Sequence, residues 1–407
     1  MDLEKFDFYW LSSPIKMNLF PENMSSADQT YKKQNSFAGL AFNEELKDVS
    51  PRIFKVCEEL DSLDLSSYQK NIIKNACDEL FDNKGPENGA TPFKLYSYNV
   101  EEITRLTDAE LPRYLFYRYR YTSFPDRLRL DHFPPCLQIE PTSICNYRCP
   151  FCYQIDSEFT KKSNGMMGMM SLDLFKKIID QAEGNCEAVT LASRGEPLIC
   201  HEIEKMLAYA AGKFLALKLN TNAWFLDEAK CHAILQSEMN TLVFSADAAS
   251  EPAYSELRVN GNLDRVYKNI KLFRDIRAKH YPDNRIITRV SGVKVPGTDD
   301  LESMNQFWGE LVDQVAFVDY NPWENVYDQP VNNIVFSCSD LWRRMFIWWD
   351  GTVNPCDSDF KSELAVGMAS SEDLSKIWLS DKYMDLRKQH QTKNRSACSP
   401  CNRCAVV

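Results

Sequence analysis

The sequence lacks long apolar runs and an N-terminal secretion signal. No segment approaches the roughly 18–20 consecutive apolar residues that a membrane-spanning helix needs. The first residues, MDLEKFDFYW, have neither the basic nor the apolar region of a signal peptide. These absences predict a protein that does not contact the membrane and stays in the cytoplasm.

An excess of positive charge is also absent. The 407 residues include 47 Lys and Arg against 58 Asp and Glu, a net charge of −11. Nucleic-acid binding requires a basic surface to neutralise phosphates, so no nucleic-acid partner is expected. One segment, 113–130 (RYLFYRYRYTSFPDRLRL), interleaves Arg with aromatic residues that could stack on bases. In an acidic chain we interpret it as a helix whose rings pack on the next domain while its Arg stems extend outward.

Length and pattern divide the chain into three predicted parts. Residues 1–130 form a mainly helical region, which has helical patterns at 51–63 and 66–81, followed by a loop at 82–92. Residues 131–325 alternate strands and helices, and residues 326–407 are too few for a strong core unless metal stabilises them. Only the second and third parts contain recognisable chemistry.

The central part predicts an α/β fold. Six runs have the pattern of strands: 136–142, 187–193, 214–220, 241–247, 285–293 and 314–320. Between them lie amphipathic helical runs at 171–182, 201–213, 227–237, 262–279 and 300–313. Such alternation predicts a parallel sheet with right-handed crossovers, in which ligands bind at the carboxyl ends of the strands.

Fourteen cysteines are the strongest compositional signal. Disulfides are rare in the cytoplasm, so clustered cysteines there indicate metal binding or catalysis. Six stand alone and are interpreted as small buried apolar residues: Cys57, Cys77, Cys136, Cys186, Cys200 and Cys231. The other eight form two groups, one of three and one of five.

The first group is Cys145, Cys149 and Cys152, directly after the first predicted strand. A structural zinc site needs four ligands, and the nearest histidine, His132, lies upstream of the strand. A [4Fe–4S] cluster held by three cysteines keeps one iron open for an outside ligand. The group therefore predicts a [4Fe–4S] cluster.

The spacing CxxxCxxC, with aromatic Phe151 before the last cysteine, resembles the signature of the radical S-adenosylmethionine (SAM) superfamily. The segment 193–197 (SRGEP) follows the second predicted strand, as the family's Gly-Glu-Pro motif does. The resemblance implies a partial (β/α)6 radical SAM barrel at about 136–320, preceded by the helical region and followed by a small Fe–S domain.

The resemblance also implies a cofactor and its contacts. By position on the strands, the residues implied to contact S-adenosylmethionine are Phe151, Gly195, Glu196, Pro197, Asn220, Asn222, Ser245, Asp247, Arg289 and Ser291. In the family, the reduced cluster cleaves S-adenosylmethionine to a 5′-deoxyadenosyl radical, which removes a substrate hydrogen. An electron donor such as flavodoxin or ferredoxin is then an expected partner.

The second group comprises Cys338, Cys356, Cys398, Cys401 and Cys404. Four thiolates permit either zinc or a fully ligated Fe–S cluster. The tract 344–356 (RMFIWWDGTVNPC) resembles the SPASM/twitch extensions that bind an auxiliary [4Fe–4S] cluster. Five cysteines are too few for two clusters, and by this analogy the preferred ligands are Cys338, Cys356, Cys398 and Cys401, with Cys404 as an alternative.

These features favour an oxidoreductase that acts on a small polyol, sugar or amino-sugar, because a closed auxiliary cluster can accept an electron from a substrate radical. One alternative is an epimerase, in which Cys200 returns the hydrogen; another is a peptide-modifying enzyme. A third is a non-catalytic Fe–S or zinc protein, against which the Gly-Glu-Pro-like loop argues. The sequence shows no clear winged-helix-like peptide-binding segment in 1–130, which favours a small molecule.

Overall fold

The computed structural model describes residues 30–31, 37–42, 45, 47–81, 90–295, 299–321, 324 and 326–407. Residues 82–89 of the predicted loop at 82–92 lie outside the described residues. Within the described part, no helix is both long and apolar enough to cross a membrane.

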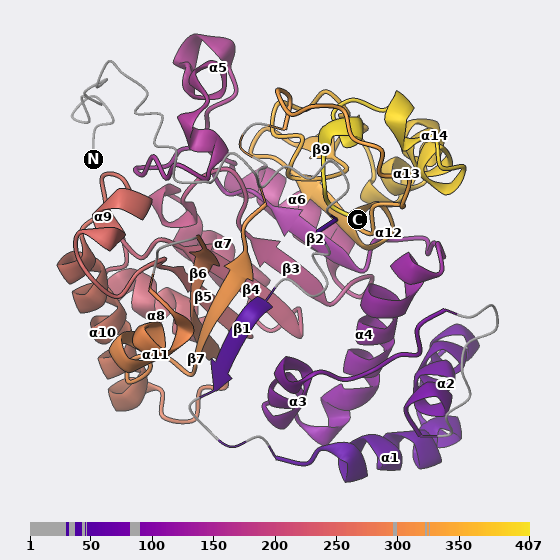
Figure 1. Ribbon diagram of the computed structural model, residues 1–407. Coiled ribbons are helices and arrows are strands. Elements are labelled where there is room, and N and C mark those ends of the chain that lie inside the picture. Colours follow the sequence, from indigo (N-terminus) through magenta and orange to yellow (C-terminus); the bar gives the residue numbers. More distant parts are fainter. Residues whose placement is uncertain are drawn as a thin grey trace.

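One ten-stranded sheet forms the centre of the molecule, in the order β1-β7-β6-β5-β4-β3-β2-β8-β9-β10 (Figure 1). Its six consecutive central strands are β2 Cys136–Ile139, β3 Ala188–Leu191, β4 Ala216–Thr221, β5 Thr241–Ser245, β6 Ile287–Lys294 and β7 Gln314–Asp319. All neighbours among these six pair in parallel, and each overlaps a predicted strand. The sheet does not close on itself, so the predicted partial (β/α)6 barrel is confirmed.

Helices cover the outer face of this sheet. They are α6 Leu172–Ala182, α7 Ile203–Ala210, α8 Glu228–Gln236, α10 Leu263–His280 and α11 Leu301–Trp308. In α6 the Ser171 side chain accepts a hydrogen bond from the Leu174 N–H, which satisfies a free donor of the first turn. Buried Leu217 and Leu219 of β4 belong to the same core as these helices. The helix predicted at 300–313 is shorter than expected, because Gly309 ends it.

The N-terminal region contributes helices α1 Ser50–Glu59, α2 Ser67–Phe81, α3 Ser97–Thr104 and α4 Leu111–Asp126. Tyr114, Leu115 and Tyr117 of α4 are buried in a cluster that also contains Cys136 and Ala188, at the amino ends of β2 and β3. The packing of the rings of 113–130 on the next domain is therefore confirmed, but Arg118 and Arg120 are buried, so the expectation that the Arg stems extend outward is wrong for these two.

Two features of the N-terminal region depart from expectation. Strand β1 (Phe37–Phe42) pairs antiparallel with β7, where we predicted mainly helices. Cys57 of α1 and Cys77 of α2 form a disulfide, so their interpretation as isolated buried cysteines was wrong. The two helices pack side by side, which brings thiols 20 residues apart to bonding distance. The other four isolated cysteines are free and buried, as predicted.

The C-terminal segment extends the sheet. It comprises α12 Asp340–Arg343, β8 Arg344–Ile347, β9 Thr352–Asn354, β10 Gly367–Met368, α13 Leu374–Trp378 and α14 Asp381–Gln391. Strand β8 pairs in parallel with β2, and β9 and β10 follow by antiparallel pairing. The hairpin predicted around Asp350-Gly351 connects β8 to β9, and Gly351 has the positive φ of 92° that such a turn needs.

Candidate metal centre and cofactor site

The first cysteine group occupies the loop that leaves the carboxyl end of β2. The Cys152 N–H donates to the Cys149 carbonyl at 3.0 Å, and the Tyr147 N–H approaches the Cys145 sulfur at 3.4 Å. The guanidinium of Arg148 donates to the Cys145 carbonyl at 2.9 Å. These local bonds hold three thiols in one short loop at the ligand-binding edge of the sheet.

The Gly-Glu-Pro-like loop packs directly on this cysteine loop. A Cβ on Gly195 would lie 2.3 Å from the Thr142 carbonyl oxygen and 2.7 Å from that of Ile144, so only glycine fits. The Glu196 N–H donates to the Ile144 carbonyl at 2.9 Å. The residue before Cys145 is thereby fixed to the end of β3.

Glu196 is a buried carboxylate with defined donors. It accepts hydrogen bonds from the Thr221 hydroxyl (2.6 Å), the Asn222 N–H (2.6 Å) and the Leu198 N–H (3.0 Å). Burial raises the pKa of Glu196, and these hydrogen bonds oppose the rise. The carboxylate therefore joins the ends of β3 and β4 and has a fixed orientation beside the cysteine loop.

Asn222 connects β4 to the cysteine loop. Its side-chain amide donates to Asn146 Oδ1 at 2.9 Å and lies 4.0 Å from the Cys145 sulfur. Two residues earlier, Asn220 Oδ1 is buried and has no hydrogen-bond partner within the described part of the chain. An unsatisfied buried acceptor fits a site that gains its donor from a ligand.

The remaining predicted contact residues lie at different depths. Ser245 and Ser291 are register partners near the carboxyl ends of β5 and β6, and both are half-buried. Pro197 is buried at the start of a short 3-10 helix, and Phe151 is buried in the cysteine loop. Arg289 lies deeper in β6 and donates from Nε to Gln314. The structure thus gathers most of these residues at one edge and places Arg289 below it.

Asp247 has a protein partner that the sequence did not reveal. Its carboxylate forms a buried ion pair with Arg258 and also accepts from the Val293 N–H at 2.7 Å. Arg258 in turn donates to the Cys149 sulfur at 3.6 Å and lies over the Phe151 ring, 5.6 Å from its centroid. No periodicity or motif marks Arg258, which follows the short helix α9 (Ala253–Leu257).

The contact between Arg258 and Cys149 gives a prediction about cluster potential. A cation that donates to a ligand sulfur stabilises the reduced, more negative cluster. Replacing Arg258 by Met together with Asp247→Asn, which avoids an unpaired buried carboxylate, should lower the midpoint potential. The expected shift is on the order of 60 mV, about 1.4 kcal/mol for one electron. EPR-monitored redox titration without S-adenosylmethionine measures the midpoint potential. Arg258→Lys, which keeps the charge, is the matched control. Equal potentials in the double variant and the natural protein would contradict the prediction.

The second cysteine group surrounds a cavity. Cys338, Cys356, Cys401 and Cys404 line it together with Asp340, Ser358, Arg395, Pro400 and Val406. Cys398 is not among the lining residues. Four thiols from two separated stretches of chain therefore face one space, the arrangement that a fully ligated Fe–S cluster requires.

Buried polar residues hold this cavity in shape. Arg395 donates to three carbonyls of the last residues: Cys401 (2.9 Å), Cys404 (2.6 Å) and Val406 (2.8 Å). The Cys338 N–H donates to His390 Nδ1 at 3.1 Å. Burial and the charge of Arg395 lower the pKa of His390 to about 3, so the ring is a neutral acceptor.

The thiols of both groups are suited to metal rather than to free reactivity. Burial raises the pKa of Cys145, Cys149 and Cys356, and it raises that of Cys152 to about 12, so their thiolates need a stabilising positive partner, which a bound metal supplies. Across the residues with assigned structure, no three His, Cys, Asp or Glu side chains converge as they would on a single ion. A [4Fe–4S] cluster binds each thiolate through a different iron, so its ligands stand farther apart.

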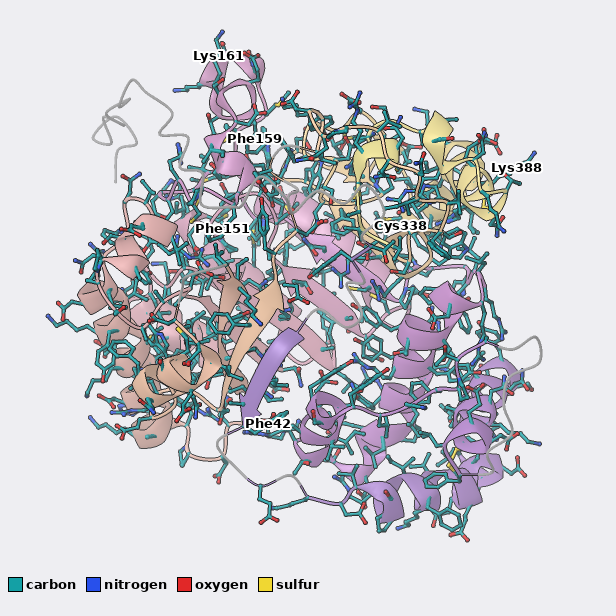
Figure 2. All side chains as sticks on the ribbon, in the orientation of Figure 1. Phe42, Phe151, Phe159, Lys161, Cys338 and Lys388 are labelled. Carbon is teal, nitrogen blue, oxygen red and sulfur yellow. A yellow bond between two sulfur atoms is a disulfide. The ribbon has the colours of Figure 1, made fainter. Side chains whose placement is uncertain are left out.

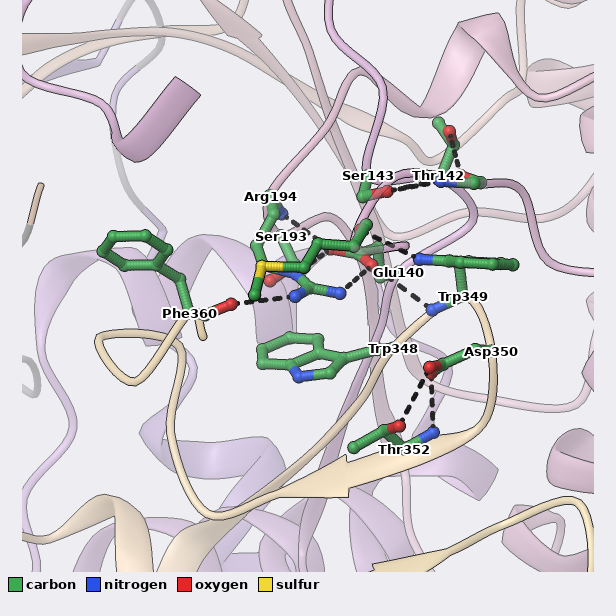
Figure 3. A network of polar contacts seen from close by, with 12 residues as sticks. Glu140, Thr142, Ser143, Ser193, Arg194, Trp348, Trp349, Asp350, Thr352 and Phe360 are labelled. Atoms are coloured by element: carbon green, nitrogen blue, oxygen red, sulfur yellow. Dashed lines mark hydrogen bonds and ion pairs between the residues drawn. The ribbon is translucent and has the colours of Figure 1, made fainter. Parts of the chain in front are cut away.

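A buried ion pair ties the Gly-Glu-Pro-like loop to the C-terminal segment (Figure 3). Glu140, directly after β2, accepts from Arg194 at 2.6 and 2.7 Å, and both side chains are almost fully buried. Arg194 also donates to the Phe360 carbonyl at 2.9 Å and stacks over the Trp348 ring at 4.1 Å. The loop that follows β3 is thus anchored to the C-terminal segment.

An aromatic cluster lies between the two cysteine groups. Its members are Tyr153, Phe159 and Phe360, with Val326. The Tyr153 and Phe360 rings are stacked with centroids 5.1 Å apart, and Phe159 meets both rings edge-on. Cys152 of the first group and Cys404 of the second both pack against this cluster. The aromatic cluster therefore contacts a cysteine of each group.

Comparisons with known proteins match the central and the C-terminal parts of the chain. The model of the radical SAM superfamily matches residues 139–290, and that of the SPASM iron–sulfur cluster-binding domain matches 338–405. The tungsten-containing aldehyde ferredoxin oxidoreductase cofactor-modifying protein of Pyrococcus furiosus is 22% identical over 315 residues, which is 65% of this chain and 86% of that protein.

Two solved structures also resemble the chain. BtrN in complex with AdoMet and 2-DOIA has 18% identity and a TM-score of 0.47, over 68% of this chain and 95% of BtrN. Streptococcus suis SuiB bound to S-adenosylmethionine has 17% identity and a TM-score of 0.47, over 84% of this chain and 88% of SuiB.

Proposed function

Because the chain is a radical SAM enzyme with a SPASM domain, with [4Fe–4S] clusters and S-adenosylmethionine as its cofactors, we propose that it oxidises a hydroxyl-bearing carbon of a small polyol, sugar or amino-sugar. The observation that carries this proposal is the four-thiol cavity joined by aromatic rings to Cys152. A cluster whose irons are all held by protein has no open position and is suited to accept an electron.

The residues that would hold each group follow from the geometry. Cys145, Cys149 and Cys152 would hold the first cluster, which when bound and reduced supplies the electron that cleaves S-adenosylmethionine to a 5′-deoxyadenosyl radical. For the auxiliary cluster we propose Cys338, Cys356, Cys401 and Cys404, which takes Cys404 in place of Cys398 as the fourth ligand. Glu196 and Asn222, both fixed beside Cys145, would orient the methionine end of S-adenosylmethionine.

The protein's own groups would hold the reactants and exclude water. Asn220 offers a buried, unsatisfied oxygen on the inner face of the sheet, and Ser245 and Ser291 offer half-buried hydroxyls at the strand ends. The loop that carries Phe159 is fixed to the C-terminal segment by the Trp349 indole N–H, which donates to the Met166 carbonyl at 3.2 Å. A Cβ on Gly168 would lie 2.5 Å from the Trp349 ring, so this loop packs tightly at the site.

An epimerase that uses Cys200 as hydrogen donor is less well supported. Cys200 is 2% exposed and belongs to the main apolar core, directly after the short 3-10 helix Pro197–Ile199. Burial raises the pKa of its thiol, as expected for a packed cysteine. No observation in the described part of the chain favours a peptide substrate over a small molecule.

Product stoichiometry tests the proposal. Reconstituted enzyme, incubated anaerobically with S-adenosylmethionine, a reductant and candidate polyols or amino-sugars, should form one 5′-deoxyadenosine for each new carbonyl. The reason is that the substrate-derived electron leaves through the auxiliary site, so no hydrogen returns to the carbon. Mass spectrometry in D₂O measures both products. Solvent deuterium at an inverted carbon, with no carbonyl, would contradict oxidation and indicate an epimerase.

A further inference from the structure

The inner face of strand β4 is accessible although β4 lies in the middle of the sheet. Its residues alternate: Leu217, Leu219 and Thr221 are buried, whereas Lys218 and Asn220 on the other face are half-buried. Leu217 and Leu219 pack with the helices of the outer face. Lys218 and Asn220 therefore point to the concave side, two residues apart on the same strand, and a ligand on that side can reach both.

Lys218 is a cation without an anionic partner. Within the described ranges, its ammonium group forms no hydrogen bond or ion pair. The positive charges of Arg289 on β6 and Arg344 on β8 repel the charge of Lys218, and the carboxylate of Glu102 on α3 and the Cys136 thiol on β2 oppose this repulsion. Burial, with these two positive charges, lowers the pKa of Lys218 to about 8, so it remains mainly protonated at neutral pH.

The carboxylates near Lys218 also act on other cations. Glu102 is the carboxylate whose charge stabilises the charged form of Lys218. The same carboxylate also attracts the charge of Arg118 on α4 and accepts a hydrogen bond from the Tyr114 hydroxyl at 2.6 Å. Arg289 shares the field of Glu102 and Glu101, and Glu101 is also paired with Arg105 at 3.3 Å. The carboxylates of Asp340 and Asp357 act on Arg344, whereas Lys218 forms no ion pair within the described ranges, in a chain whose net charge is −11. Partly buried charge of one sign is costly unless a counter-charge arrives.

We propose that Lys218, assisted by Arg289, binds an oxyanion group of the substrate, a carboxylate or a phosphate, on the inner face of the barrel. This inference rests on the proposed function, because it assumes that the substrate occupies the space below Asn220 and Ser245. The anion lies deeper than the strand-end residues and so sets how far the substrate enters. The substrate is thereby an acidic derivative of a polyol, sugar or amino-sugar, rather than a neutral one.

Calorimetric titration of the reconstituted holoenzyme with inorganic phosphate and, separately, with acetate tests the site. Lys218→Met, which keeps the length of the side chain and removes its charge, should weaken binding about 10- to 100-fold, the worth of one charge-assisted contact. Lys218→Arg should bind within about threefold of the natural protein. The control is Lys388→Met, because Lys388 projects into solvent from α14 (Figure 2) and should bind like the natural protein.

A second measurement does not depend on folding of the variants. Trace labelling with acetic anhydride, followed by peptide mapping, reports whether phosphate or acetate protects Lys218 in the natural holoenzyme; protection of Lys218 and not of Lys388 supports the site. Protection of Lys218 by phosphate but not by acetate assigns a phosphate site, and protection by both anions assigns a carboxylate-sized site. Unchanged affinity in Lys218→Met, or no protection, would overturn the proposal. Cleavage of S-adenosylmethionine by the natural holoenzyme is measured alongside, because its absence would refute the proposed function without affecting the anion measurements.

Discussion

Replacing Cys145, Cys149 and Cys152 together by alanine should abolish cleavage of S-adenosylmethionine and remove about half of the bound iron. The natural protein is expected to carry about eight irons in two [4Fe–4S] clusters, and the variant about four. All three thiols belong to one loop at the carboxyl end of β2, and no other described cysteine lies in that loop to replace them as cluster ligands. Iron determination and chromatographic detection of 5′-deoxyadenosine after anaerobic reconstitution measure the two effects.

The matched control is Cys231→Ala, which removes a free cysteine that is fully buried in α8, a helix that carries no candidate site residue. It should keep about eight irons and full cleavage, with only a packing cost to stability. Cleavage that persists in the triple variant would show that another site performs it. An unfolded triple variant is recognised because the auxiliary irons would then also be lost.

Replacing Cys338 and Cys356 by alanine should separate cleavage from oxidation. The first cluster and its loop remain, so 5′-deoxyadenosine should still form, whereas the oxidised product should fall about 100-fold, equivalent to about 2.7 kcal/mol. The physical reason is that the substrate radical loses its electron acceptor at the four-thiol cavity. The ratio of 5′-deoxyadenosine to carbonyl product, with the iron content, measures the uncoupling.

Cys398 and Cys404 provide the internal comparison for this experiment. Cys398→Ala should keep about eight irons, since Cys398 is outside the lining of the cavity, whereas Cys404→Ala should lose about four. The reverse result would restore the ligand set that the twitch analogy prefers. Zinc in place of iron at this site would refute the auxiliary cluster and leave the first cluster unaffected.

Much of the fold follows from local pattern. The six central strands alternate with amphipathic helices, and each such unit buries its own apolar face, as α6 does with Phe175, Ile178 and Ile179. The pairing of β1 with β7 is different, because it joins Phe37–Phe42 to a strand more than 270 residues later and depends on the assembled sheet. The Cys57–Cys77 bond likewise depends on how α1 packs on α2, which spacing alone does not specify.

The candidate site divides in the same way. The cysteines and the Gly-Glu-Pro-like loop could be found because the chemistry requires those residue types at close spacing. Arg258 and Lys218 could not, because an arginine after a short helix and a lysine in a strand are ordinary in sequence. Their importance comes from register and packing: Arg258 lies beside Cys149, and Lys218 lies on the concave face of the sheet. Only the three-dimensional arrangement specifies such contacts.

The parallel pairing of β8 with β2 has a consequence for how the protein can be divided. β2 is the strand that precedes the first cysteine loop, and β8 lies beyond the predicted boundary at residue 325. A fragment ending there would expose the amide and carbonyl groups along one side of β2, an open edge that can recruit strands of other molecules. The fragment that contains the first cysteine loop is therefore expected to aggregate when it is produced alone. The C-terminal segment covers the open edge of β2, whether or not that segment contains iron.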